Sequence, residues 1–458
     1  MSATQAHPKG LYLLFATEMW ERFSYYGNRA LLALFMISAL SFDKQFTSAL
    51  YGQYTGLVFL TPLIGGYIAD RYWGNQRSIL VGGLLMAAGQ FALFFASTFY
   101  TNLTLALPFF YSGLGLICLG NGFFKPNIST MVGQLYAPND ARKDAAYTIF
   151  YMGINLGSFC APLICGTLGD TGNPADFRWG FLAAGVGMLL SLVIFQTFKN
   201  KYLLSPEGQI LGLPPKQLSA LEKSQIDTSL TTIDIQRMIV IGVLAFFVVF
   251  FWSAFEQAGV SLTFFAREST DRMIYGFEVP ASWFQSLNPV FVLIFAPIMA
   301  RLWMSLSAKG KEPSSPTKMA WGLILLGLGY VVIAFGVDGI GAGMKVSILW
   351  LVSMYWLHTM GELCLSPIGL SLVNKLAPAR FASLLMAVWF LANAAANWFA
   401  GILAGFYPES GKPFPSFLGW QVTNLHDFFM LFVAMSFLAG GLLLLASKPL
   451  QKMMHGIR

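Results

Sequence analysis

Apolar segments long enough to cross a lipid bilayer recur along almost the whole chain. A transmembrane helix needs about 20 predominantly apolar residues. Only 11% of the 458 residues are charged, whereas a soluble protein has about 25%. We therefore predict an all-α membrane protein with twelve transmembrane helices, at roughly 12–40, 50–70, 78–98, 103–125, 145–168, 178–198, 238–265, 283–304, 318–336, 345–374, 381–405 and 425–447.

A polar stretch divides these segments six and six. Residues 199–236 are rich in proline and glycine and offer one candidate surface helix near 216–223. We predict an N-terminal six-helix bundle over 1–198, a cytoplasmic linker over 199–236 and a C-terminal six-helix bundle over 237–458. Two six-helix halves are typical of the major facilitator fold, in which the substrate binds near the bilayer midplane between the halves. Fold alone does not establish function.

The positive residues set the predicted orientation. With both termini in the cytoplasm, nineteen of the 28 lysines and arginines lie on the inside, six lie outside and three lie within the spans. This asymmetry follows the positive-inside rule, so both termini are predicted to be cytoplasmic. The net charge of +7 is then a consequence of topology and gives no argument for nucleic-acid binding. The four cysteines fall within or at the ends of spans, where they are expected to act as small buried residues, and no metal-ligand spacing appears.

The first span carries a stripe of ionisable residues. Glu18, Glu21, Arg22, Tyr25 and Arg29 fall within roughly 100° of one another on a helix. A charged side chain in mid-membrane costs roughly 2.5–3.5 kcal/mol on insertion scales. Such a stripe is tolerated where it faces a protein interior or a wet cavity, which is typical of a carrier.

Two further acids lie in spans of the second half. Glu256 occurs in the seventh span, and Glu362 lies one turn before Ser366 in the tenth. Pro367 is expected to kink or break that helix and to free backbone carbonyls near the acid. A buried acid beside a proline favours a binding site. For His358, a hydrogen-bonded position in the core is favoured over a role as a proton relay.

Other polar positions allow two interpretations each. The loop after the second span holds Gly66, Asp70 and Arg71 with the spacing of a major-facilitator gating loop, which favours packing and ion pairing over direct substrate contact. Gly66 is expected to permit close helix contact. Lys125 in the fourth span could bind substrate or simply extend to the interface. In the fifth span Asn155 lies one turn after Tyr151 and could line a cavity or belong to a helix-packing surface.

The buried charges do not balance. The spans hold three cations and four acids, and one proton would neutralise the excess. We therefore expect one glutamate to alternate between a basic partner and a proton, which is what proton symport requires. The cations are Arg22, Arg29 and Lys125, and the acids are Glu18, Glu21, Glu256 and Glu362.

Several motifs together resemble one family, the proton-dependent oligopeptide transporters (POT, also PTR2) of the major facilitator superfamily. The resemblance covers essentially the whole chain and rests on the first-span run from Glu18 to Gly27, the Gly66–Gly74 loop, Phe123–Asn127, Phe150–Ser158, Phe255–Gln257 and Glu362–Pro367. It implies proton-driven import of di- and tripeptides by alternating access, with a central zwitterion-binding cavity between the two bundles.

The resemblance also implies roles for individual residues. Proton coupling would involve Glu18, Glu21, Arg22, Lys125 and Glu362, and Lys125 would pair with Glu362. The peptide carboxylate would meet the cations of the first half, and the amine would meet Glu362 together with Asn155 and Asn288. The implied substrate-binding residues are Arg22, Tyr26, Arg29, Lys125, Tyr151, Asn155, Glu256, Trp283, Asn288, Glu362, Ser366 and Trp389.

The alternatives to peptide transport are an anion carrier, a peptide sensor and an intramembrane enzyme. A divergent member could carry nitrate or another small solute, and a transceptor could sense peptides without net transport. An enzyme is not expected, since no catalytic set or metal cluster falls on facing spans. No cofactor is expected beyond the proton gradient that drives transport. The expected partners are peptides and the lipid bilayer, with no nucleic acid, and we expect a monomer in the cytoplasmic (inner) membrane.

Overall fold

Twelve long α-helices make up most of the described chain. The computed structural model describes residues 6–137, 140, 142–214, 231–341, 343–378, 381–409, 411–417 and 419–457. The long helices are α1 (Lys9–Ser38), α2 (Lys44–Ile68), α3 (Gly74–Thr98), α4 (Leu103–Gln134), α5 (Lys143–Gly169), α6 (Phe177–Tyr202), α7 (Thr232–Phe255), α9 (Leu287–Ala308), α10 (Ser315–Gly336), α11 (Ile348–Leu376), α12 (Ala382–Ala404) and α13 (Leu425–Met453).

These helices match the twelve predicted segments in order. Within the described residues, ten segments are long and apolar enough to cross a membrane, and one of them, Lys44–Thr98, contains both α2 and α3. The helix α1 is not among the ten because its middle turns carry the ionisable stripe. The predicted all-α membrane architecture is confirmed.

The seventh segment is not the single helix that was predicted over 238–265. The helix α7 ends at Phe255, a 3₁₀ turn follows at Glu256–Gly259, and the short helix α8 spans Ser261–Glu268. A Cβ atom at Gly259 would lie 2.0 Å from the Tyr51 hydroxyl, so the break lies where another part of the chain approaches closely. The surface helix expected near 216–223 lies outside the described residues.

Short strands and turns connect the helices. Strands of two residues each occur at β1 (Thr270–Asp271), β2 (Met273–Ile274), β3 (Phe277–Glu278), β4 (Val346–Ser347), β5 (Ser416–Phe417) and β6 (Trp420–Gln421). They form the pairs β1–β4, β2–β3 and β5–β6. A π-helical turn, Ala69–Trp73, joins α2 to α3, and 3₁₀ turns at Pro174–Asp176 and Ala281–Ser286 precede α6 and α9.

The chain divides into two compact units. Unit 1 comprises Met1–Ser41 and Leu57–Ser219, and unit 2 comprises Phe42–Gly56 and Ala220–Arg458. The helix α2 therefore contributes its first turns to unit 2 and its last turns to unit 1. The bundle boundaries given by the sequence, which assign all of α2 to the first half, stay a prediction.

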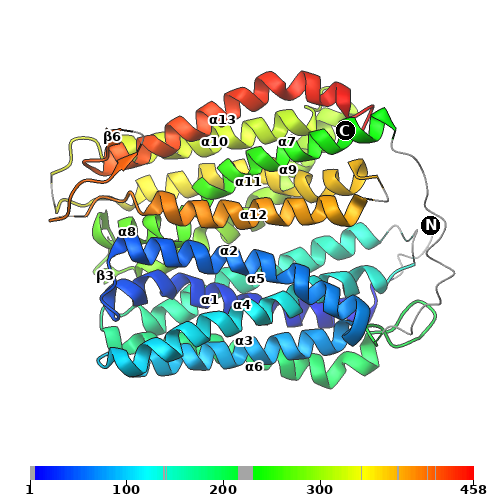
Figure 1. The fold of residues 1–458 in the computed structure, drawn as a ribbon, viewed down its shortest axis with the longest axis horizontal. Helices are drawn as coiled ribbons and strands as arrows, with labels where there is room; N and C mark the ends of the chain where they lie inside the picture. Colours follow the sequence, from blue (N-terminus) through cyan, green and yellow to red (C-terminus); the bar gives the residue numbers. More distant parts are fainter. Residues whose placement is uncertain are drawn as a thin grey trace. The chain divides into compact units, whose positions relative to one another are not determined.

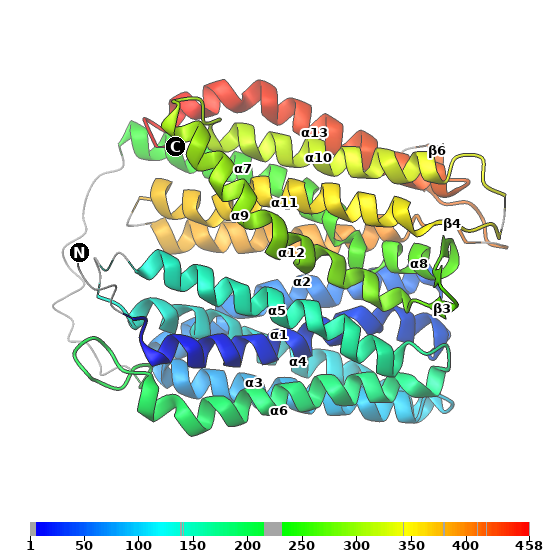
Figure 2. The same cartoon turned by 180° about the vertical axis from the view of Figure 1, so that it is seen from behind.

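Glycines allow the helices of unit 1 to pack closely. The helices α1, α3, α4, α5 and α6 run side by side (Figures 1 and 2). A Cβ atom at Gly82 of α3 would lie 2.5 Å from the Gly120 carbonyl oxygen of α4. Seven residues further along α3, a Cβ atom at Gly89 would lie 2.8 Å from the Gly113 carbonyl oxygen. Small residues at such spacing bring membrane helices into backbone contact.

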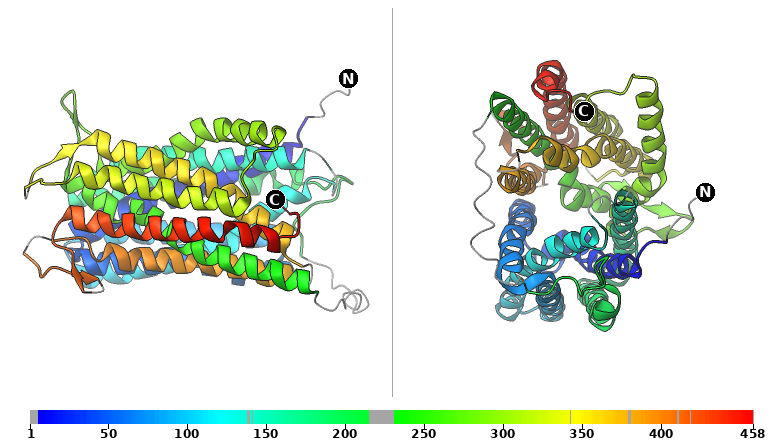
Figure 3. Two further views of the ribbon diagram at one scale, coloured as in Figure 1. Left: turned by 90° about the horizontal axis from the view of Figure 1, so that it is seen from above. Right: turned by 90° about the vertical axis from the view of Figure 1, so that its right-hand side faces the viewer.

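Unit 2 contains a similar close contact and one peripheral helix. A Cβ atom at Gly52 of α2 would lie 2.7 Å from Cα of Gly401 in α12. The helix α9 crosses obliquely and packs mainly on α11, with few of its residues buried (Figures 2 and 3). Its N-terminal end carries a candidate site residue, Asn288.

Candidate functional site

The ionisable stripe of α1 is buried inside unit 1. Glu18 and Glu21 are 0% exposed and Arg22 is 1% exposed. The Arg22 guanidinium forms an ion pair with Glu21, in which Nη2 donates to Oε1 at 2.6 Å. The Arg22 Nε lies 3.3 Å from Oε1 of Glu18. Among the described residues, neither carboxyl oxygen of Glu18 has a hydrogen-bond partner, so Arg22 holds Glu21 more closely than Glu18.

Aromatic rings extend this set toward the next turns of α1. The guanidinium of Arg22 lies 5.2 Å from the ring centroid of Tyr25. That of Arg29 lies 5.9 Å from Tyr25 and 5.7 Å from Tyr26. Cations within about 6 Å of an aromatic face are attracted by its quadrupole. The rings thus give these cations neighbours without neutralising their charge.

Close packing of α5 against α1 fixes one side of the stripe. A Cβ atom at Gly157 would lie 2.2 Å from the carbonyl oxygen of Met19, so the two backbones touch beside Glu18. The interpretation of the fifth span as a packing surface is confirmed for this glycine. Asn155 is buried and donates from Nδ2 to the Tyr151 carbonyl of its own helix at 2.9 Å, while the Tyr151 side chain is exposed.

Lys125 of α4 is a further cation that lies close enough to interact with the ionisable stripe of α1. It interacts electrostatically with Arg22, Glu18, Glu21 and Arg29 and is half-buried. Within the described part of the chain its ammonium group has no hydrogen bond or ion pair. One turn earlier in α4, the Gly122 carbonyl oxygen would lie 2.0 Å from a Cβ atom at Gly65 of α2. The backbone at Lys125 is therefore held against α2 in unit 1.

The predicted gating loop is a π-helical turn rather than an open loop. Arg71 donates from Nη1 to the Tyr67 hydroxyl at 2.9 Å. Asp70 is exposed and has no ion pair or hydrogen bond within the described ranges. The expectation that Gly66 permits the close helix contact is wrong, because a Cβ atom there would have ordinary contact with Pro126 at 3.8 Å. Gly65 makes the close contact instead, since it faces the Gly122 backbone.

In unit 2 a neutral amide holds the buried acid of α11. Glu362 is 8% exposed, and Asn288 donates to its Oε2 from Nδ2 at 2.6 Å. The same amide nitrogen lies 3.1 Å from Oγ1 of Thr359, which donates to the Tyr355 carbonyl at 2.8 Å. Thr359 was not among the predicted site residues, although its position three residues before Glu362 was the available signal.

The remaining predicted residues of unit 2 have different surroundings. Glu256 lies in the turn that ends α7 and interacts electrostatically with Glu362. Trp283 is half-buried, with its ring centroid 5.8 Å from that of Phe277. Trp389 is 5% exposed, and its indole would lie 2.3 Å from a Cβ atom at Gly369. The side chain of Ser366 lies outside the described residues.

The helix α11 contains two residues, Pro367 and His358, for which the sequence made predictions. The helix is continuous from Ile348 to Leu376, so a break at Pro367 is wrong, while a kink there stays a prediction. A proline removes only one backbone donor, and the helix continues past it. His358 is buried against Tyr330, with ring centroids 4.7 Å apart, and bonds the Leu326 backbone. Its predicted role in the core is confirmed.

Comparison with known proteins identifies the family. The model of the POT family matches residues 76–209 and 216–417. The chain belongs to the POT family. It is 38% identical to the uncharacterized transporter YclF of Bacillus subtilis over 98% of this chain and 96% of that protein. It is 37% identical to the peptide transporter YePEPT of Yersinia enterocolitica, over 87% of this chain and 88% of that protein.

A solved structure of a POT-family member has the same fold. The structure of a peptide transporter POT variant in complex with alafosfalin superposes with a TM-score of 0.85 at 33% identity, covering 99% of this chain and 97% of that one. The chain is thus a multi-pass membrane protein of a transporter family and not an enzyme. Within the described residues, no group of three or more His, Cys, Asp or Glu side chains could hold a metal ion.

Proposed function

We propose that this POT-family member is a proton-coupled symporter that imports di- and tripeptides by alternating access. The observation that carries the proposal is the buried Glu18–Arg22–Glu21 group on a membrane helix. Charge at this depth is expensive and is retained in membrane proteins chiefly where it binds an ion, a proton or a substrate. The names of relatives support peptides as the substrate, since they include a peptide transporter and a di-/tripeptide transporter.

The charges of the two units match the two ends of a peptide. The unit 1 set of Glu18, Glu21, Arg22, Arg29 and Lys125 carries a formal charge of +1 when all are ionised. We assign the substrate carboxylate to its cations, because guanidinium and ammonium groups form short charge-assisted hydrogen bonds to carboxylates. The cations assigned to the carboxylate are Arg22, Arg29 and Lys125.

The unit 2 acids are assigned to the amine. Glu256 and Glu362 carry −2 together when ionised, and the described partner of Glu362 is the neutral amide of Asn288. An ammonium group would give Glu362 the positively charged partner that a neutral amide does not provide. Asn155 and Asn288 are assigned to the amine together with Glu362. Recognition of both charged ends would leave the peptide side chains free to vary, and their proposed contacts are Tyr26, Tyr151, Trp283, Ser366 and Trp389.

The proton is assigned to the buried glutamates. Glu18 accepts no hydrogen bond from the described residues, and burying a neutral carboxylic acid costs less than burying an unsatisfied carboxylate. Proton uptake at one of these acids would release its cation to bind substrate. The driving force is then the proton gradient across the cytoplasmic membrane, with both termini on the cytoplasmic side, and no cofactor takes part.

Uptake in liposomes tests this function. Purified protein is reconstituted, an inward proton gradient is imposed and accumulation of labelled dialanine is followed. We expect concentrative uptake that a protonophore abolishes and that falls to the level of protein-free liposomes in Glu21→Gln and Glu362→Gln. Glu207→Gln is the matched control, because Glu207 is exposed in the turn after α6 and loses the same charge.

Two results would contradict the proposal. Uptake that persists in both variants would remove these acids from proton coupling. Absence of dialanine uptake by a folded wild-type protein, with nitrate uptake or dialanine binding alone, would favour an anion carrier or a peptide sensor.

A further inference from the structure

A pocket lies at the end of unit 1 where α1 begins and where α4 and α6 end. Its volume is about 670 Å³, within the range of small-molecule sites, and it is lined by Pro8, Lys9, Leu135, Tyr136, Ala137, Asp140, Arg142, Lys201, Tyr202, Leu204, Ser205 and Pro206. None of these residues belongs to the candidate transport site. By the positive-inside rule this end of the unit is cytoplasmic.

Packing holds the walls of the pocket in place. A Cβ atom at Gly10 would lie 2.6 Å from the Tyr202 carbonyl oxygen and 2.7 Å from Leu135, so α1 contacts both neighbours at this point. His7 Nδ1 lies 2.8 Å from the Tyr136 hydroxyl, which ties the segment before α1 to the end of α4. The pocket is therefore a feature of the folded unit.

One side of the pocket is an internally neutral ion pair. Arg142 Nη2 donates to Asp140 Oδ2 at 2.6 Å, and its Nη1 donates to the Ala6 carbonyl at 3.0 Å. Hydrogen bonds from the Arg142 side chain and backbone amide lower the pKa of the Asp140 carboxyl to about 2, so Asp140 stays ionised and balances Arg142 at neutral pH.

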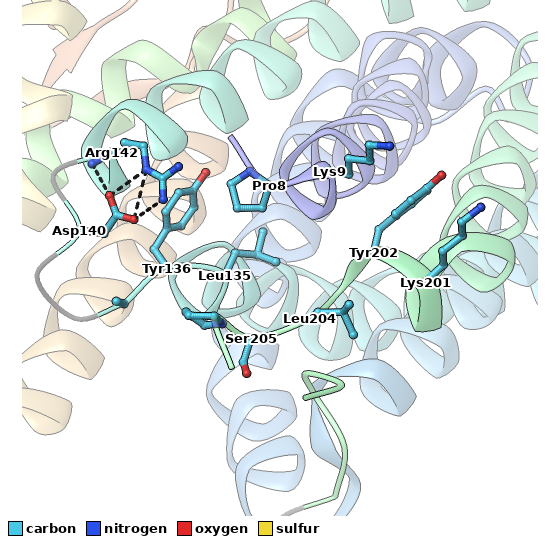
Figure 4. Close-up of a pocket in the computed structure, with 12 residues that line it drawn as sticks. Pro8, Lys9, Leu135, Tyr136, Asp140, Arg142, Lys201, Tyr202, Leu204 and Ser205 are labelled. Carbon is cyan, nitrogen blue, oxygen red and sulfur yellow. Dashed lines mark hydrogen bonds and ion pairs between the residues drawn. The ribbon is translucent and has the colours of Figure 1, made fainter. Parts of the chain in front are cut away.

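The opposite side carries positive charge that no described acid balances. The ammonium groups of Lys9 and Lys201 lie 5.9 Å and 5.4 Å from the ring centroid of Tyr202. In Figure 4, Tyr202 lies between the two lysines, on the far side of the pocket from Asp140 and Arg142. Among the described residues, neither lysine has a hydrogen bond or an ion pair. The first turn of α1 also has no acidic residue and no side-chain cap, and such a helix start favours an anion.

We propose that this pocket binds the phosphate group of an anionic phospholipid of the cytoplasmic leaflet. Two ammonium groups and a phenol hydroxyl provide donors for phosphate oxygens, while Pro8, Leu135 and Leu204 offer apolar contact to the glycerol and the first acyl carbons. The volume exceeds what one inorganic ion requires, and basic pockets between helices on the cytoplasmic side suit such headgroups.

Native mass spectrometry of delipidated protein titrated with phosphatidylglycerol tests the lipid site. Each lysine near an anionic headgroup is worth about a fivefold change in affinity, so the double variant Lys9→Gln/Lys201→Gln should lose one tightly bound phosphatidylglycerol, with an affinity lower by roughly 25-fold. The matched control is Lys448→Gln/Lys452→Gln, which removes two positive charges from the end of α13 and should leave that lipid bound. Tyr202→Phe, which keeps the ring, should weaken binding less than the double variant.

Two further probes separate the sources of the phosphate. Phosphatidylcholine carries a phosphate without net negative charge and should not compete, and inorganic phosphate followed by ³¹P line broadening should bind weakly or not at all. Phosphate binding that depends on Lys9 and Lys201, without lipid retention, would support the anion site and overturn its assignment to a lipid. Equal phosphatidylglycerol retention in the double variant and the control would overturn the proposal as a whole.

Discussion

The two units bury their acids in different ways. In unit 1 a guanidinium lies beside both Glu18 and Glu21. In unit 2 the partners of Glu362 in the described residues are uncharged, with Asn288 as its donor and Thr359 next to that donor. Glu18 and Glu21 thus lie beside a cation, whereas Glu362 is held by a hydrogen bond from a neutral amide.

This difference determines what each set can exchange. A buried ion pair is costly to break from one side, because the remaining charge is left without compensation. A carboxyl group that is hydrogen-bonded to a neutral amide can gain or lose a proton, or bind an ammonium group, and no buried cation loses its partner. The comparison therefore assigns a tightly coupled group to unit 1 and a more accessible negative charge to unit 2.

The largest effect is expected at Arg22. Arg22→Met leaves two buried carboxylates without a cation between them and should lower the free energy of unfolding by about 3–5 kcal/mol. The measurement is the midpoint of thermal unfolding of purified protein in detergent. Addition of Glu18→Gln and Glu21→Gln in the same chain should restore most of the loss. A loss that persists in this triple variant would mean that Arg22 acts through packing rather than charge.

A smaller effect is expected at the amide of unit 2. Asn288→Leu removes the donor to Glu362 and should cost about 1–3 kcal/mol, the range for leaving a buried group unsatisfied. In the same unfolding assay, Asn288→Asp should cost more than Asn288→Leu at neutral pH, because it places a second carboxyl beside the first. A cost as large as that of Arg22→Met would contradict the distinction between charge balance and hydrogen bonding.

Close backbone contacts position the charged residue in both units. A Cβ atom at Gly65 would lie 2.0 Å from the carbonyl oxygen of Gly122, which is one turn before Lys125. A Cβ atom at Gly361, next to Glu362, would lie 2.7 Å from the Gly322 carbonyl oxygen. Gly65→Ala and Gly361→Ala should each destabilise by about 1–3 kcal/mol through overpacking. Gly66→Ala is the control, since its Cβ atom would have ordinary contact. Equal unfolding midpoints for Gly65→Ala and Gly66→Ala would show that α2 and α4 can separate without cost.

Much of the membrane architecture could be predicted because its signals are local. Apolar length fixes the helices, and the spacing of Glu18, Glu21 and Arg22 fixes their shared face. The break after Phe255 was missed, since Gly259 lies in an otherwise apolar stretch and the Tyr51 hydroxyl that contacts it comes from a distant part of the sequence. For the same reason Gly66 was chosen over Gly65: which of two adjacent glycines faces the neighbouring helix depends on the rotation of α2.

The composition of the site was predictable to a similar extent. Ionisable residues in apolar spans can be predicted as site residues from the sequence, because burying a charge in a membrane is costly and is retained mainly for function. Uncharged polar partners cannot be predicted in this way, because many threonines and serines occur in the spans. Thr359 was missed for this reason. Whether Lys125 pairs with a charge, and whether Ser366 contacts substrate, stay predictions from the family resemblance.

The smallest effect is expected at Thr359, and it tests how the unit 2 acid is held. Thr359→Val keeps the shape of the side chain and removes the hydroxyl 3.1 Å from the Asn288 amide, so a loss of about 0.5–1.5 kcal/mol is expected. In a double-mutant cycle with Asn288→Leu, the coupling energy should be of the same size, and Thr359→Ser should retain it. If the losses of stability in the two single variants simply add in the double variant, the Thr359 hydroxyl does not orient Asn288. The hydrogen bond from Asn288 to Glu362 would then be independent of Thr359. A measurable coupling would instead make Thr359, Asn288 and Glu362 one unit, in which neutralising the acid also changes how the amide is oriented.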